Sequence, residues 1–164
     1  MALFKVNSEI TDDYMTPSSA WEQIAHLIQD RGVVWEPFYG DGTSGDHLKK
    51  LGLDVIHQNE DFFLNDRGTI IVTNPPFSQA KKVLERLKEL GKPFVIILPS
   101  SKINTQYFRS LFLNEIQLII PKKRIQFIRF KNGVSAPTKS GAPNFDCFYY
   151  CWKMNFERDL NWID

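Results

Sequence analysis

Short apolar runs alternate along the chain with segments in which apolar residues recur every three or four positions. A run of β-branched residues without polar alternation indicates a strand buried on both faces, and the recurrence indicates an amphipathic helix. The predicted strands are 33–38, 53–57, 70–72, 93–98, 116–120 and 145–152, the last of them antiparallel to its neighbour. The predicted helices are 18–31, 46–52, 79–90 and 107–113, with Thr16 or Ser18 as cap of the first and Ser78 of the third. This alternation predicts a doubly wound α/β fold.

The first predicted strand runs into a glycine-rich turn, Gly40-Asp41-Gly42-Thr43-Ser44-Gly45, and then into a helix. Glycine adopts positive φ and lets the backbone approach a ligand closely, so this unit predicts a nucleotide-type cleft. The turn lacks the second pyrophosphate signal of a dinucleotide site, and an acid, Glu36, stands near the strand end.

The strand 70–72 runs directly into Asn74-Pro75-Pro76-Phe77. The two prolines cannot donate ladder hydrogen bonds, so the strand must end there, at the sheet edge where open α/β folds bind ligands. The Asn74 amide oxygen and the Pro75 carbonyl can both accept from one NH2 group, while the Phe77 ring can stack on a flat substrate. This stretch therefore predicts a pocket for a planar amine; the alternative is a strand terminator followed by a core phenylalanine.

The chain of 164 residues is long enough for one domain with a substantial core. We expect residues 1–11 to be a flexible lead-in, 131–144 a mobile loop and the last dozen residues a tail. No apolar run is long enough for a bilayer and no secretory signal is recognisable, so an intracellular location, cytoplasmic or nuclear, is expected. Four residues of extended chain place Cys147 and Cys151 roughly 13 Å apart, which predicts reduced thiols, and no metal-ligand spacing is present.

The net charge of +1 is uninformative, but its distribution is uneven. No acidic residue lies between Ile116 and Phe145, whereas six basic residues do: Lys122, Lys123, Arg124, Arg129, Lys131 and Lys139. A basic face that also carries Phe127 and Phe130 is compatible with a phosphate-bearing substrate. The alternative is a solvated rim whose acidic partners lie elsewhere in the chain.

These stretches resemble, in order, the motifs of S-adenosylmethionine-dependent amino methyltransferases that act on adenine N6 or on protein glutamine. Tyr14-Met15-Thr16-Pro17 resembles motif X, EPFYGDGT from Glu36 resembles motif I, Asp61-Phe62-Phe63 resembles motif III and NPPF resembles motif IV. The resemblance covers nearly the whole chain and implies a Rossmann-like class I fold: a three-layer αβα sandwich with a mostly parallel seven-stranded sheet and an antiparallel last strand.

The resemblance implies S-adenosylmethionine as the cofactor. Its implied binding residues are Tyr14, Thr16, Pro17, Glu36, Pro37, Phe38, Gly40, Gly42, Gln58, Asp61, Phe62 and Asn74. Glu36 would take the cofactor's ammonium group, and Asp61 would accept from its adenine amino group. The sequence departs from the family where an acid usually binds the ribose hydroxyls, since His57 and Gln58 stand there, so either Gln58 bonds the ribose or Glu60 reaches in from the following turn.

The implied reaction is methyl transfer to the exocyclic N6 amine of adenine in DNA, because the short chain and the PKKRIQF segment most resemble small viral or phage-type DNA adenine methyltransferases. The implied catalytic residues are Asn74, Pro75, Pro76 and Phe77, and the implied substrate contacts are Phe77, Ser78, Lys122, Lys123, Arg124 and Phe127. No target-recognition domain fits, so specificity would come from the loop 131–144 or from a partner subunit. RNA adenine, protein glutamine and a non-catalytic scaffold subunit are the alternatives.

Overall fold

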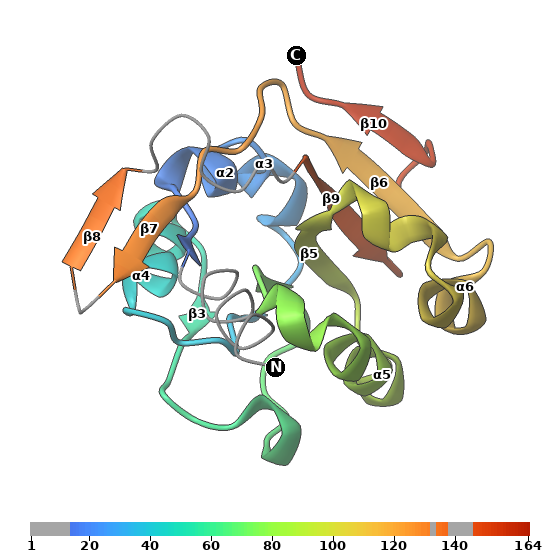
Figure 1. Cartoon of the computed structure of the whole chain (residues 1–164), viewed down its shortest axis with the longest axis horizontal. Helices are drawn as coiled ribbons and strands as arrows, with labels where there is room; N and C mark the ends of the chain where they lie inside the picture. The colour runs from blue at the N-terminus through green and yellow to red at the C-terminus, as the bar shows by residue number, and fades with distance from the viewer. Residues whose placement is uncertain (1–13, 132–133, 138–145) are drawn as a thin grey trace, which may run out of the picture.

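The computed structural model describes residues 14–131, 134–137 and 146–164, and the elements follow the predicted alternation (Figure 1). The helices are α2 (Ser18–Glu22), α3 (Ala25–Ile28), α4 (Thr43–Lys50), α5 (Ala80–Leu90) and α6 (Gln106–Phe112), with 3-10 turns η1 (Phe62–Leu64), η2 (Phe77–Gln79) and η3 (Ser100–Asn104). The strands are β1 (Tyr14–Met15), β2 (Val34–Trp35), β3 (Val55–Ile56), β4 (Ile70–Thr73), β5 (Phe94–Pro99), β6 (Ile116–Ile120), β7 (Ile128–Lys131), β8 (Val134–Pro137), β9 (Cys147–Trp152) and β10 (Leu160–Trp162). The predicted flexibility of residues 1–11 lies outside the described residues.

Seven strands form the main sheet in the order β10-β6-β9-β5-β4-β2-β3. All neighbours are parallel except β9, which runs antiparallel to both β5 and β6. The predicted mixed seven-stranded sheet and its antiparallel strand near the C-terminus are therefore confirmed. The chain leaves β2 toward β3 on one side and leaves β4 toward β5 on the other, so the adjacent β2 and β4 mark the topological switch point of the sheet.

The middle of the sheet is the buried core of the molecule. Every residue of β4 and β5 is buried, as expected for continuous apolar strands covered on both faces. β5 pairs with β9 over six residues, and the Tyr150 hydroxyl on β9 donates to the Pro99 carbonyl at 2.7 Å. Cys147 and Cys151 on β9 are buried free thiols, which confirms the prediction, and burial raises the pKa of Cys147 to about 12.

Helices cover both faces of this sheet. α2 contacts α4, and α5 contacts α6, and Figure 1 shows these two groups on opposite sides of β5 and β9. α5 buries Val83, Leu84 and Leu87 and leaves Lys81 and Lys82 exposed, as its periodicity predicts. No helix of the described part is long and apolar enough to cross a membrane.

A second, antiparallel sheet of three strands, β1-β7-β8, lies beside the main one. The prediction of a loop over 131–144 was wrong for Val134–Pro137, which forms β8 and pairs with β7 residue by residue. β1 pairs with the other edge of β7, Tyr14 opposite Arg129. The sequence did not reveal β8, because this stretch is rich in turn-forming residues. β8 is a strand because it pairs with β7, and no local pattern shows that pairing.

Two predicted helices and the C-terminal tail also differ from expectation. The predicted helix 18–31 is two short helices, α2 and α3, and Pro17 stands at the N-cap position without a side-chain cap. α5 begins after the η2 turn, likewise without the predicted cap from Ser78. The C-terminal tail contains β10, which extends the sheet by pairing in parallel with β6.

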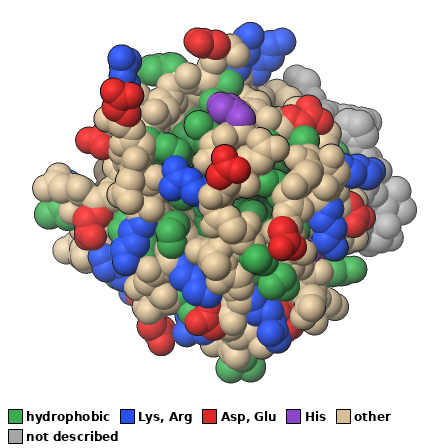
Figure 2. Space-filling model, turned by 180° about the vertical axis from the view of Figure 1, so that it is seen from behind, with side chains coloured by type: hydrophobic (Ala, Val, Ile, Leu, Met, Phe, Trp, Pro, Cys, Tyr) green, Lys and Arg blue, Asp and Glu red, His purple; other side chains and the backbone are tan. Residues whose placement is uncertain are grey.

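Seen from behind the view of Figure 1, the surface carries both signs of charge. Figure 2 shows Lys and Arg side chains interspersed with Asp and Glu over this face. Elsewhere among the described residues charges are also paired, for example Lys88 with Glu115 at 3.0 Å. This face therefore offers no patch of a single sign.

Candidate active site

A cleft of about 240 Å³ lies beyond the carboxyl ends of β2 and β4. Three segments from different parts of the chain form most of its wall: 14–16 from β1 onward, 37–40 after β2, and 74–77 after β4. Ser44 and Glu60 complete the lining. The cleft thus stands at the switch point, where doubly wound sheets bind ligands, and it joins the glycine turn to the proline corner as the sequence predicts.

Asn74 lines this cleft, and a hydrogen bond orients its amide. Its Nδ2 donates to the Thr16 hydroxyl oxygen at 2.8 Å. Its Oδ1 is shielded from water and has no hydrogen-bond partner among the described residues. Buried polar atoms are nearly always satisfied, so an orphaned acceptor in a cleft wall marks a place for a ligand's donor. Thr16 is 2% exposed and serves this amide rather than capping the helix, as the sequence had allowed.

The two prolines and Phe77 form the next part of the wall. Pro75, Pro76 and Phe77 all line the cleft, and Phe77 is only 7% exposed. Phe127 packs edge-on against the Phe77 ring, with centroids 6.1 Å apart. Phe127 itself does not line the cleft, so its contact with Phe77 holds that ring in position.

Glu36 lies beneath the cleft floor and not in its wall. Its Oε1 accepts from the Phe38 N–H at 3.1 Å and from the Thr73 hydroxyl, so one carboxyl ties the turn after β2 to the end of β4. Burial raises the pKa of Glu36 to about 8, although the bonds from Thr73 and Phe38 lower it. The carboxyl is therefore mostly protonated at neutral pH.

The glycine turn has the backbone that its sequence predicts. Gly40 lines the cleft with φ +59°, and a Cβ there would lie 3.0 Å from Met15 Sδ. Asp41 fixes the turn by accepting from the Thr43 N–H at 3.0 Å and from the Thr43 hydroxyl at 2.6 Å. Gly42, with φ +87°, is the N-cap residue of α4 and does not line the cleft.

An acidic residue in the turn after β3 lies at the cleft. Glu60 lines the cleft, whereas Gln58 is exposed and lies outside the lining. Arg67 grips both Glu60 oxygens, Nε to Oε1 at 2.5 Å and Nη2 to Oε2 at 3.0 Å, and lowers the pKa of that carboxyl. Of the two alternatives that the sequence left open, the structure brings Glu60 to the site.

Comparisons with known proteins agree with this geometry at the level of fold. No protein-family model matches the sequence, and no curated protein sequence matches it. Among solved structures, a candidate RNA methyltransferase from Pyrococcus horikoshii superimposes with a TM-score of 0.54 at 14% identity, over 88% of each chain. The chain has the class I methyltransferase fold.

Another solved structure shares the likeness more weakly. An S-adenosylmethionine-dependent O-methyltransferase from Thermotoga maritima has a TM-score of 0.49 at 9% identity, over 88% of this chain and 68% of that one. In this methyltransferase fold the predicted cofactor residues Tyr14, Thr16, Pro37 and Phe38 line the cleft together with Gly40 and Asn74.

Three further predicted cofactor residues of this methyltransferase fold stand behind the wall. Pro17 is the N-cap residue of α2, and Asp61 caps the η1 turn by accepting from the Phe63 N–H at 2.8 Å. Phe62 is 3% exposed and packs against Phe38, with ring centroids 5.1 Å apart. Asp61 and Phe62 thus position the Phe38 side of the cleft without lining it.

The sequence interpretation missed Met15, Tyr39 and Ser44 as residues that line the cleft. Met15 and Tyr39 stand inside the quoted motifs. Their closeness in sequence to predicted site residues was therefore the only signal that could have identified them. Tyr39 stacks on His57 with centroids 5.0 Å apart, and Ser44 Oγ accepts from Trp21 Nε1 at 3.4 Å. These contacts join residues distant in sequence, which no local pattern encodes.

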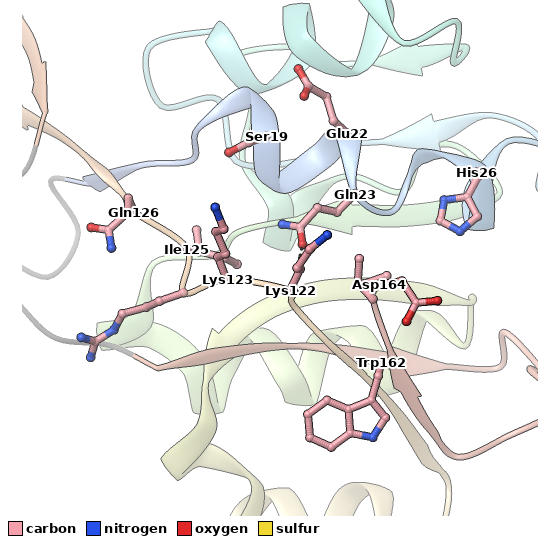
Figure 3. Close-up of a pocket in the computed structure, with 12 residues that line it drawn as sticks. Ser19, Glu22, Gln23, His26, Lys122, Lys123, Ile125, Gln126, Trp162 and Asp164 are labelled. Atoms are coloured by element: carbon pink, nitrogen blue, oxygen red, sulfur yellow. Dashed lines mark hydrogen bonds between the residues drawn. The ribbon is translucent and has the colours of Figure 1, made fainter.

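The predicted substrate residues fall into two places. Phe77 lines the cleft, and Ser78 follows it, exposed, in the η2 turn. Lys122, Lys123 and Arg124 line a separate and larger cavity of about 770 Å³, between α2 and β10 (Figure 3). The structure therefore does not bring these three cations into the cleft itself.

Proposed function

We propose that this chain is an S-adenosylmethionine-dependent methyltransferase that transfers a methyl group to the exocyclic N6 amine of adenine in DNA. The observation that carries the proposal is the position of Asn74, a cleft-lining residue whose buried Oδ1 has no hydrogen-bond partner among the described residues, at the switch point of a class I methyltransferase fold. The amide is fixed by Thr16 at 2.8 Å, so its free oxygen is presented in one direction. A donor from a ligand is what this atom lacks.

The donor and acceptor set of the cleft fits the cofactor. Gly40 allows close approach of the backbone, Phe38 presents a ring, and the Glu60 carboxylate is placed to accept from ribose hydroxyls. Tyr14 and Thr16 close the cleft from the β1 side. The residues behind the lining hold these groups in place: Pro17, Glu36, Gly42, Asp61 and Phe62.

The residues at the proline corner account for the chemistry. When bound, the cofactor supplies an electrophilic methyl group. The target amine is a poor nucleophile because its lone pair is delocalised into the ring. Two N–H donors of the amine, held by Asn74 Oδ1 and the Pro75 carbonyl, bring its nitrogen nearer to tetrahedral geometry and free the lone pair. Alignment and fixed dipoles then lower the barrier without a strong proton acceptor. The Phe77 ring stacks on the target adenine. An adenine in a duplex must first be flipped out.

The substrate class is open to direct test, since an RNA adenine or a glutamine amide presents the same NH2 geometry. Labelled methyl transfer from tritiated cofactor to DNA, RNA and protein pools separates these three. Label in DNA that digests to N6-methyladenine supports the proposal. Label in RNA or protein alone would move the substrate and keep the enzyme class.

The role of Asn74 is tested by Asn74→Ala. The variant should lower the rate of methyl transfer by about a hundredfold or more, as loss of one preorganised polar contact does in other enzymes. Calorimetry should show cofactor binding close to wild type, which also serves as the control for folding. Full activity of Asn74→Ala would refute the assignment. Absence of cofactor heat in the wild-type protein would instead favour a non-catalytic scaffold.

A further inference from the structure

The main sheet ends at β10, and the outer edge of this strand carries backbone groups that β6 does not use. β10 pairs only with β6 among the described strands, and Figure 1 shows it at the margin of the sheet. The Asp159 carbonyl and the Ile163 N–H bond to β6 at 2.8 and 3.0 Å. Because peptide groups alternate in direction along a strand, the N–H and C=O of Leu160 and Trp162 face outward.

Two large apolar side chains project from one face of this edge strand. Leu160 is 47% exposed and Trp162 is 70% exposed, whereas the other tryptophans are all buried. Alternate residues of a strand share a face, so both side chains lie on the side of α6, where Leu160 lines a cavity. Figure 3 accordingly shows the indole pointing away from Lys122 and Lys123. β10 contains no proline or lysine that would prevent another strand from pairing with it.

The cavity beside Leu160 has a volume of about 340 Å³, lies between α6, β6 and β10, and is called the α6 groove below. The buried rings of Phe108 and Phe112 line it from α6. Exposed Ile103 and Leu113 stand at its border. An apolar groove beside an open strand edge indicates a surface that another protein molecule covers.

A second copy of β10, running antiparallel, is complementary to this edge. In a two-fold symmetric pair centred on Asn161, Leu160 of each copy lies opposite Trp162 of the other. The outward N–H and C=O groups of these two residues then bond to each other, and all three residues of the strand are paired. Residues that lie opposite each other share a face, so the indole of each copy reaches over Leu160 toward the α6 groove of the other.

The residues that flank the strand carry opposite charges in this register. Arg158 of each copy stands opposite Asp164 of the other, and both side chains are exposed without an ion pair inside the described ranges. The Asp159 carboxylate accepts from Gln117 Nε2 at 3.1 Å, so it is held at β6, and Glu157 lies farther from the axis. The two symmetry-related pairs favour this antiparallel register over others.

We propose that the chain forms a symmetric dimer in which β10 pairs antiparallel with β10 of a second copy and each Trp162 packs at the α6 groove of the other. The inference goes beyond the proposed methyl transfer and does not rest on it. The α6 groove shares no lining residue with the cleft, and three strands separate β10 from β4. The strands of the two copies run in opposite directions, so the two clefts open at opposite edges of the joined sheet.

Sedimentation velocity over a series of concentrations measures the dimer without cofactor or nucleic acid. The wild-type chain should pass from monomer to a species of twice the mass as its concentration rises. The dissociation constant should lie in the micromolar range, as for other small interfaces. A chain that stays monomeric up to about 1 mM would overturn the proposal.

Two changes in β10 test the surface. Trp162→Ala should raise the dissociation constant about thirtyfold or more, because each dimer loses two packed indoles. Leu160→Pro removes an outward N–H, leaves the ladder to β6 intact and should also weaken the dimer. The matched control is Leu64→Ala in the η1 turn, which removes another exposed leucine and should dimerise like wild type. Unchanged dimerisation of both β10 variants, or an equal loss in the control, would contradict the proposal.

The register is tested by exchanging charges. Arg158→Asp or Asp164→Arg alone places like charges opposite each other at two positions and should raise the dissociation constant about two- to thirtyfold at low salt. Arg158→Asp/Asp164→Arg restores opposite charges and should recover the wild-type dissociation constant. Thermal unfolding of each variant at low concentration checks that the monomer is folded. A double variant no tighter than the single ones would overturn pairing centred on Asn161.

Discussion

At the scale of single residues, the decisive feature is how one amide is oriented. The Asn74 amide is oriented by its Nδ2, which donates to the Thr16 hydroxyl and leaves Oδ1 without a partner among the described residues. Thr16 comes from the segment before α2, 58 residues earlier in the chain. The sequence singled out both residues, but it did not show that the Thr16 hydroxyl accepts from the Asn74 amide.

This arrangement predicts that Thr16→Val impairs the reaction more than binding. Valine fills the same volume but leaves Nδ2 without an acceptor, so the amide can rotate away from the substrate. We expect kcat to fall about tenfold, the usual scale for about 1.4 kcal/mol, with KM for the nucleic acid little changed. Thr16→Ser restores the hydroxyl and should recover most of the rate. A loss confined to KM for the cofactor would contradict this role and indicate a cofactor contact instead.

Glu36 predicts a pH dependence of stability. Its pKa is about 8 in the folded protein and near the ordinary value of 4.5 in the unfolded chain. Between these values the unfolded chain binds fewer protons, so the free energy of unfolding falls as pH rises through this window. Below pH 4.5 Glu36 causes no loss of unfolding free energy. Above pH 8 the loss reaches its full value, on the order of a few kcal/mol.

Urea unfolding of wild type and Glu36→Gln at pH 5, 6, 7 and 8 measures this effect. Glutamine keeps an oxygen that can accept from Phe38 and Thr73 but does not ionise. The variant should gain stability relative to wild type progressively from pH 5 to pH 8. A difference that stays constant over this range would show that Glu36 is not the group responsible.

At the scale of elements, the first turn of α4 is fitted closely to the strand beside it. A Cβ on Gly45 would lie 2.3 Å from His57 Cδ2. The His57 ring cannot easily move, because its Nδ1 lies 2.8 Å from the Glu36 carbonyl oxygen and its face stacks on Tyr39. A glycine inside a helix therefore allows the helix to approach β3.

Two opposing effects decide the outcome of Gly45→Ala. Alanine gains up to about 1 kcal/mol of helix propensity, while overpacking costs about 1–3 kcal/mol. The clash should win, so thermal unfolding should shift to lower temperature. The double variant Gly45→Ala/His57→Ala removes the obstructing ring and should be less destabilised than the sum of the single changes. Additive losses would show that the two residues are not in conflict.

Contacts between elements explain why the sequence misplaced the bounds of the first helix and did not predict β8 and β10. The periodic pattern predicted one helix over 18–31, but the chain breaks it at Gln23 and Ile24, where Gln23 bonds to both Lys122 and Tyr149. β8 and β10 consist of ordinary or turn-like sequence and become strands only because β7 and β6 offer open edges. Tertiary pairing outweighs local propensity in such short segments.

At the scale of the whole molecule, the sheet order brings the site together. Parallel strands β2 and β4 lie side by side, so the turns after them share one edge. The small sheet adds the segment 14–16 by pairing β1 with β7. Three pieces that are distant in sequence form one cleft, while the cations 122–124 line a separate cavity.

The sequence by itself determined the alternation of strands and helices, the glycine turn, the proline corner and the reduced state of the cysteines. Each of these depends on local chemistry: the fixed φ of proline, the positive φ of glycine, or the apolarity of a continuous run.

Only the tertiary structure decided which side chains face the cleft. It placed Glu60 there instead of Gln58, tied the Glu36 carboxyl to Thr73 outside the lining, and set Thr16 against Asn74. These outcomes depend on contacts between segments tens of residues apart, whose geometry is fixed by strand order and packing and leaves no periodic trace in the chain.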